Sequence, residues 1–159
     1  MPLPLLYVVP AMVQATPNWD GTYTLQSGKD QVPAAIEKSV AGLNAIMKPI
    51  WRKKLEGREK FYESLLILVG SNLTISFGKE SPLTVPIGGS VSWKRSDGEA
   101  FLATMRKDGE TIVLNLEGDE GQRSLAFTLQ GGTLTERITV KNPKLSAPLE
   151  YTLEFRKSQ

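Results

Sequence analysis

Turn signals recur at nearly regular intervals between Val91 and Arg156. Three of them, Ser96–Glu99, Lys107–Glu110 and Gly118–Gly121, begin eleven residues apart, and Gly131–Gly132 follows at a similar interval. Asp-Gly and Gly-Gly pairs supply the positive φ angles that tight hairpins require. Because tight turns join antiparallel neighbours, this half of the chain is predicted to be an up-and-down antiparallel meander.

Apolar and polar residues alternate between these turns, which is the period of a strand with one dry and one wet face. The segments 19–25 and 64–78 are predicted to form an opening strand and a hairpin. Residues 83–85 are predicted to form a short strand at an edge or bend, because prolines flank them. The fold class is therefore mainly β, an up-and-down barrel of about 8 to 10 strands. The alternating apolar positions of the meander are Ile112, Leu114, Leu116, Leu125, Phe127, Leu129, Leu134, Ile138, Val140, Leu149, Tyr151, Leu153 and Phe155.

A helical pattern separates the opening strand from the hairpin. Spacings of three and four residues, typical of an amphipathic helix, join Ile36, Val40, Leu43, Met47 and Ile50. Pro49 predicts a kink or break near Lys48, and Gly57 is expected to weaken or end the segment beyond it. We therefore expect a helical pair, or one kinked helix, between strands one and two.

The length of 159 residues suits a single barrel domain, expected over residues 16–159. Residues 1–15 carry no charged side chain and end in Val13-Gln14-Ala15, which resembles a signal-peptidase site. They also lack a basic start and contain three prolines. Two interpretations remain open: an export signal, which would make the protein periplasmic or secreted, or a disordered N-terminal arm on a cytoplasmic protein.

This layout resembles the calycin superfamily, and most closely its intracellular lipid-binding (fatty-acid-binding) branch, which places its helices between strands one and two. Trp19, Gly21 and Tyr23 are similar to that group's aromatic-x-Gly-x-aromatic opening, and Phe155-Arg156-Lys157 is similar to its aromatic-then-charged ending. A bacterial exported lipocalin-like domain also fits this appearance. The lipid-binding branch often ends in an Arg-x-Tyr pair that grips a carboxylate. Leu153 and Phe155 occupy the matching positions here, so that function does not carry over.

Most catalytic and metal chemistry finds no support in the residues. The chain has no Cys and no His, so a thiolate nucleophile, the commonest general base and the commonest transition-metal ligand are missing. Turn chemistry explains Asp97, Asp108 and Asp119, and strand alternation directs Glu150 and Glu154 outward. The net charge of +2 is too small to indicate a nucleic-acid partner. We expect no enzyme activity, no cofactor and no metal.

The barrel interior is the predicted site. A nearly closed sheet of this size can enclose a ligand cavity, which favours binding or transport of a small hydrophobic or amphiphilic molecule. The alternative is a non-catalytic structural or interaction module of the cell envelope with a filled core, and a hydrolase or isomerase built on carboxylates is a third hypothesis. The predicted lining residues are Trp93, Phe101, Met105, Ile112, Leu114, Leu125, Phe127, Ile138, Tyr151 and Leu153.

A second predicted site is the basic helical segment between Lys48 and Lys60. Trp51 stands there beside Arg52, Lys53 and Lys54, a mixture typical of a helix that touches an anionic membrane surface. The competing interpretation is a solvated basic face on a helix that packs against the barrel. Oligomeric state is not predicted by any of these patterns.

Overall fold

The computed structural model describes residues 18–59, 61–119 and 121–158, so the predicted signal or arm over residues 1–15 lies outside the described part. The first half of the chain contains β1 (Gly21–Ser27), the 3-10 turn η1 (Lys29–Gln31), α1 (Val32–Val40), α2 (Met47–Arg58), β2 (Ser64–Val69), β3 (Asn72–Phe77) and β4 (Leu83–Pro86). The second half contains β5 (Ser90–Lys94), β6 (Ala100–Asp108), β7 (Thr111–Gly118), β8 (Gly121–Gln130), β9 (Thr133–Lys141) and β10 (Leu149–Lys157).

The ten described strands form one antiparallel sheet in the order β4-β3-β2-β1-β10-β9-β8-β7-β6-β5. Each described strand pairs with the next one along the chain, except that β4 does not pair with β5. In addition, β1 pairs with both β2 and β10 and thereby joins the first and last described strands. Among the described strands, β4 and β5 are the two edges, so the barrel is nearly closed. The predicted mainly β meander is confirmed, with the helices between strands one and two.

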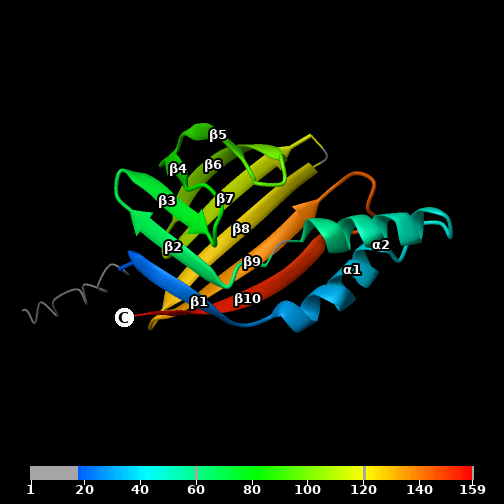
Figure 1. Ribbon diagram of the computed structural model, residues 1–159, viewed down its shortest axis with the longest axis horizontal. Coiled ribbons are helices and arrows are strands. Elements are labelled where there is room, and N and C mark those ends of the chain that lie inside the picture. The colour runs from blue at the N-terminus through cyan, green and yellow to red at the C-terminus, as the bar shows by residue number, and fades with distance from the viewer. Residues whose placement is uncertain (1–17, 60, 120, 159) are drawn as a thin grey trace, which may run out of the picture.

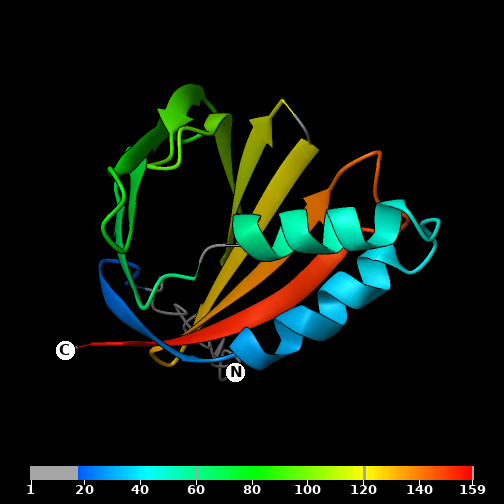
Figure 2. The same ribbon diagram turned by 45° about the vertical axis from the view of Figure 1, so that its right-hand side comes forward.

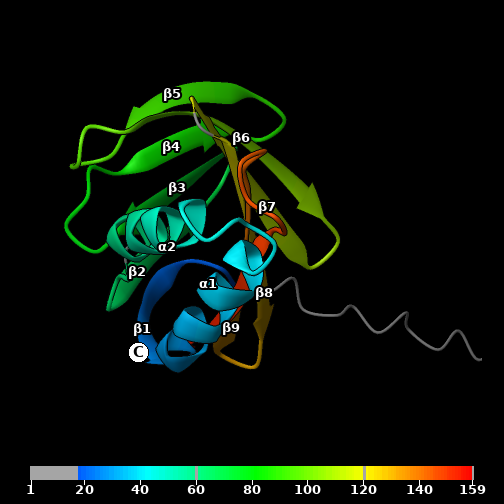
Figure 3. The ribbon, with the colours of Figure 1, turned by 90° about the vertical axis from the view of Figure 1, so that its right-hand side faces the viewer.

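The sheet curves round a common interior, and the two helices cover one end of it. Figure 1 shows α1 and α2 together at the end of the molecule opposite the C-terminus. In Figure 2, α2 runs from the middle of the barrel outward over the β8–β10 side, with α1 beneath it. Viewed from the helical end, the strands surround the interior and the helices lie in front of them (Figure 3).

Turn chemistry sets the hairpins as predicted. Gly109 has φ 61° between β6 and β7, and Gly131 and Gly132 have φ 56° and 82° between β8 and β9. These left-handed angles are accessible to glycine at little cost. The hairpin register then aligns inward residues across neighbouring strands: Leu114 is opposite Leu125, and Leu125 is opposite Ile138.

The helical segment differs from the predicted pattern. The break lies over residues 41–46 rather than at Lys48, and the Asn44 side chain accepts hydrogen bonds from the backbone N–H groups of Ile46 and Met47, at 3.1 and 2.8 Å. Pro49 is the third residue of α2. Backbone N–H groups in the first turn of a helix make no hydrogen bond within it, so the lack of an N–H in proline costs nothing there. Ile50, expected in the buried stripe, is 46% exposed.

The core is continuous from the helices through the barrel. Trp19 and Tyr23 are both buried at the start of β1, and the Tyr23 hydroxyl donates to the Trp19 carbonyl at 2.7 Å. The loop before β10 is tied to α1, because the Ser146 hydroxyl donates to the Ser39 carbonyl at 2.7 Å. Neither of the two described helices has the length and apolar character needed to cross a membrane.

Candidate functional site

A cavity lies inside the barrel beneath the helical end. Its volume is about 40 Å³, which is room for a few water molecules. Most of its wall is apolar, but two guanidinium groups, one carboxyl group and two phenols also reach it. The lining residues are Tyr62, Leu65, Phe77, Trp93, Arg95, Leu116, Arg123, Leu125, Glu136, Ile138, Tyr151, Leu153 and Phe155.

The predicted interior residues all point inward, since each of the ten is buried. Strand alternation therefore predicted the inward face correctly. Five of them line the cavity: Trp93, Leu125, Ile138, Tyr151 and Leu153. The other five pack in the surrounding core and do not line this cavity: Phe101, Met105, Ile112, Leu114 and Phe127.

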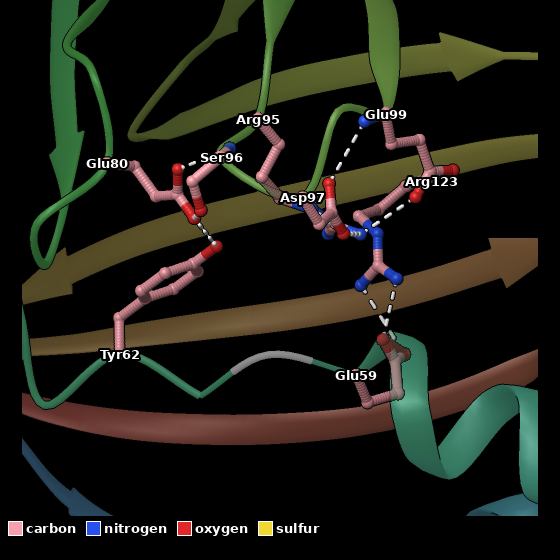
Figure 4. A network of polar contacts seen from close by, with 8 residues as sticks. All are labelled: Glu59, Tyr62, Glu80, Arg95, Ser96, Asp97, Glu99 and Arg123. Carbon is pink, nitrogen blue, oxygen red and sulfur yellow. Dashed lines mark hydrogen bonds and ion pairs between the residues drawn. The ribbon is translucent and has the colours of Figure 1, made fainter.

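A buried ion pair joins α2 to the barrel wall. Arg123 on β8 donates through both terminal nitrogens to Glu59, the residue that follows α2, at 2.6 and 3.4 Å (Figure 4). The Glu59 side chain is 2% exposed and that of Arg123 is 16% exposed. Burial lowers the pKa of Arg123, but the charge and hydrogen bonds of Glu59 outweigh burial and raise it overall. The guanidinium therefore stays charged and neutralises Glu59.

Glu136 is the carboxyl group of the cavity wall, and it lies within the electrostatic influence of the Glu59–Arg123 pair. It is only 6% exposed, and no hydrogen bond or ion pair links it to another residue in the described part of the chain. Burial raises the pKa of Glu136 to about 8, against the attraction of Arg123 and with a further contribution from Glu59. At neutral pH the carboxyl group is thus mostly protonated, because burial without a partner disfavours the charged form of an acid.

Tyr151 completes this end of the cavity. Burial, and then the negative charge of Glu59, raises the pKa of its phenol, so the hydroxyl remains protonated. Arg123, Glu136 and Tyr151 belong to neighbouring strands β8, β9 and β10. We call these three residues together with Glu59 the interior polar cluster.

A second polar network holds the rim of the barrel. The Arg95 guanidinium donates to Asp97 at 3.0 and 2.8 Å and to Glu99 at 2.8 Å, all within the turn between β5 and β6 (Figure 4). The Glu80 carboxylate accepts from the backbone N–H and the hydroxyl of Ser96, at 2.8 and 2.7 Å. Glu80 lies in the β3–β4 loop, so this network links the loops at the two edge strands.

A row of aromatic side chains also lies across the gap between the edge strands β4 and β5. The ring centroids of Tyr62 and Phe77 are 5.4 Å apart, those of Phe77 and Trp93 are 5.8 Å apart, and those of Trp93 and Phe101 are 6.1 Å apart. Trp93 also donates its indole N–H to the Ser81 carbonyl at 3.0 Å. Side-chain packing thus covers the interior where the described edge strands β4 and β5 do not pair.

The sequence prediction missed the charged residues of the interior, although alternation carried a signal for two of them. Arg123 stands two residues before inward Leu125, and Glu136 stands between inward Leu134 and Ile138. Strand alternation therefore predicts that both side chains point inward. Glu59 carried no such signal, because the direction of the chain after α2 depends on how the helix packs.

The predicted membrane segment is only partly on the surface. Trp51 is 2% exposed and packs in the core, so it does not present its indole to a membrane. Arg52 forms an ion pair with Glu37 of α1, whereas Lys53 and Lys54 are exposed. The exposed apolar residues of this region are Ile46, at 75% exposed, and Ile50.

Comparison with known proteins identifies the fold. No protein-family profile and no curated protein sequence matches the chain. Among solved structures, lipid binding protein 8 of Caenorhabditis elegans is 15% identical with a TM-score of 0.59, and the match covers 93% of this chain and 100% of that one. A Schistosoma mansoni fatty acid binding protein in complex with arachidonic acid is 14% identical with a TM-score of 0.59, covering 91% and 98%. Zebrafish ileal bile acid-binding protein complexed with cholic acid is 14% identical with a TM-score of 0.56, covering 89% and 100%.

These matches agree with the ten-stranded, nearly closed antiparallel barrel and its helical pair. The chain has the fold of the fatty-acid-binding proteins. The expected resemblance is confirmed at the level of fold, and these neighbours are named as binding and transport proteins.

Proposed function

We propose that this protein binds a small hydrophobic or amphiphilic molecule inside its barrel, without a chemical step. The observation that carries this proposal is the interior cavity, which combines an apolar wall with buried polar groups that no apolar core requires. The likeness to proteins named for fatty acid and bile acid binding supports it.

The cavity volume of about 40 Å³ sets a condition on this function. An alkyl chain fits only if lining side chains turn aside, since even one water needs roughly 10–15 Å³ of such volume. The aromatic side chains at the gap between β4 and β5 are suited to this role, because the backbones of these two edge strands are not held together by a strand ladder.

Displacement of an environment-sensitive apolar dye tests the proposal. We expect saturable dye binding that lipids displace, and native mass spectrometry of freshly purified protein to detect a bound small molecule. Trp93→Ala enlarges the cavity at the gap and is expected to strengthen dye binding, whereas Leu102→Ala, an exposed position on β6, leaves it unchanged. Absence of binding across several dyes would overturn the proposal.

The small cavity also favours the second hypothesis, a structural or interaction module with a filled interior. That hypothesis forecasts no dye binding by the wild type and no co-purified molecule. It also forecasts that Trp93→Ala only destabilises the fold. The same two measurements therefore separate the two functions.

We further propose that the exposed face of α2 meets anionic membranes during ligand exchange. Lys53 and Lys54 lie on the same exposed helix as Ile50, with Ile46 just before it, and this combination of cations and apolar side chains suits an anionic lipid surface. Buried Trp51 supports this face from inside, with the Lys54 ammonium 4.7 Å from its ring centroid.

A further inference from the structure

The interior polar cluster holds two carboxyl groups and one guanidinium. Arg123 is already engaged by Glu59 through both terminal nitrogens, at 2.6 and 3.4 Å, so their charges cancel. Arg95, the other guanidinium of the cavity wall, is engaged in the same way by Asp97 and Glu99. Glu136 lines the cavity and has no hydrogen-bonding partner among the described residues. The polar group left for a ligand is therefore a carboxyl group rather than a guanidinium.

A ligand carboxylate fits this cluster poorly. To reach Arg123 it would have to displace Glu59, which would then be a buried charge without a partner. Glu136, protonated at neutral pH, offers no positive charge to balance the ligand carboxylate, so the ligand charge would be buried without a counter-ion.

An ammonium group fits poorly for the opposite reason. It would have to give up its hydration in the cavity and would approach the buried positive charge of Arg123. A purely apolar ligand avoids both charges but leaves the Glu136 carboxyl group buried without a hydrogen bond.

A hydroxyl group satisfies the cluster in either protonation state of Glu136. It donates to a carboxylate, accepts from a protonated carboxyl group, and can also accept from the phenol of Tyr151. Burial raises the pKa of Glu136 to about 8, so the protonated form is available at neutral pH.

On the basis of the proposed binding function, we infer that the interior site selects an apolar ligand whose polar end is a neutral hydroxyl group, bound by Glu136, over the corresponding carboxylate or amine. Glu136 is then the specificity-determining residue, and the Glu59–Arg123 pair excludes anions by keeping the guanidinium occupied.

The test uses a saturated alcohol, carboxylic acid and amine that share one alkyl chain, each competing with the apolar dye at neutral pH. We expect the alcohol to bind about tenfold more tightly than the acid or the amine, the difference that one buried hydrogen bond supplies. Glu136→Leu should weaken alcohol binding by a similar factor, while Glu136→Gln, which keeps a donor and an acceptor, should retain it.

Glu150→Leu is the matched control, because it makes the same change on the outer face of β10 and should leave all three affinities unchanged. Binding of the acid as tightly as the alcohol, or unchanged alcohol affinity in Glu136→Leu, would overturn the inference while leaving the binding function in place. Failure of the dye and all three ligands to bind would overturn both.

Discussion

The carboxylate of Glu59 at the end of α2 lies 2.6 Å from the guanidinium of Arg123 on β8, and the two side chains are only 2% and 16% exposed. We expect Glu59→Ala to reduce the free energy of unfolding by about 3–5 kcal/mol, because it leaves Arg123 buried without its partner. Chemical denaturation measures this loss. The double variant Glu59→Leu with Arg123→Leu should recover most of the stability, since it removes both charges together. A loss below about 1 kcal/mol in Glu59→Ala would mean that the pair is solvated.

Glu136 makes stability depend on pH. Its pKa rises from an ordinary 4.5 to about 8 on folding, so the folded state binds more protons between these values. The free energy of unfolding should therefore fall as pH rises from about 4 to about 8 and level off above that range.

Denaturation of Glu136→Gln across the same pH range checks this expectation. In this variant the free energy of unfolding should fall much less as pH rises. Glu150→Gln, on the exposed face, should keep the wild-type dependence on pH. Identical slopes in the wild type and Glu136→Gln would show that Glu136 does not titrate differently on folding.

Buried aromatic residues should dominate the core. Trp19→Ala and Phe127→Ala are each expected to cost about 3–5 kcal/mol, since both side chains are almost fully buried. Leu102→Ala, at a 45% exposed position on the outer face, should cost well under 1 kcal/mol in the same urea titration. Comparable losses at Phe127 and Leu102 would contradict the assigned faces.

Alanine substitutions at two glycines are expected to change stability in opposite directions. Gly28 has φ 115°, and a Cβ built on it would lie 2.3 Å from the Thr152 carbonyl oxygen, so Gly28→Ala should destabilise the junction between β1 and the helices. Gly57 lies inside α2 with open space around it, so Gly57→Ala should stabilise the protein by about 0.5–1 kcal/mol. Thermal denaturation of the two variants should give shifts of opposite sign.

Charge reversal on α2 tests the membrane face. Lys53→Glu with Lys54→Glu should slow ligand transfer from anionic vesicles and barely change transfer from neutral ones, because the attraction is electrostatic. Stopped-flow transfer measures both rates. Trp51→Ala, a buried change in the same helix, should lower stability instead. Equal transfer rates for the wild type and the charge-reversed variant would end the membrane proposal.

Sequence alternation predicted much of this fold because each strand repeats a simple rule. A period of two set the inward face, and Asp-Gly and Gly-Gly pairs set the hairpins, so residues such as Leu125 and Ile138 were assigned correctly. The helical break was misplaced for a local reason: the Asn44 side chain accepts from the backbone N–H groups of Ile46 and Met47, and α2 begins there, before Pro49.

The interior polar cluster was harder to predict. Alternation places Arg123 and Glu136 on the inner face of their strands, but a charged residue on an otherwise apolar face identifies a site only when its partners are known. The members of this cluster come from the end of α2 and from three strands, and their meeting depends on barrel curvature and helix packing. The same tertiary placement turns Trp51 inward and leaves Ile50 on the surface.

The pairing of β1 with β10 has a consequence for the order of folding. Among the described strands, a ribosome releases β1 first and β10 last, so β1 waits for one of its two neighbours until all the other described strands have been synthesised. Local hairpins such as β8–β9 can form early, whereas closure depends on contacts between distant parts of the chain, which are slow to form. Until then the edges of the unfinished sheet are open to other chains, and the nascent protein should depend on chaperones most in that interval.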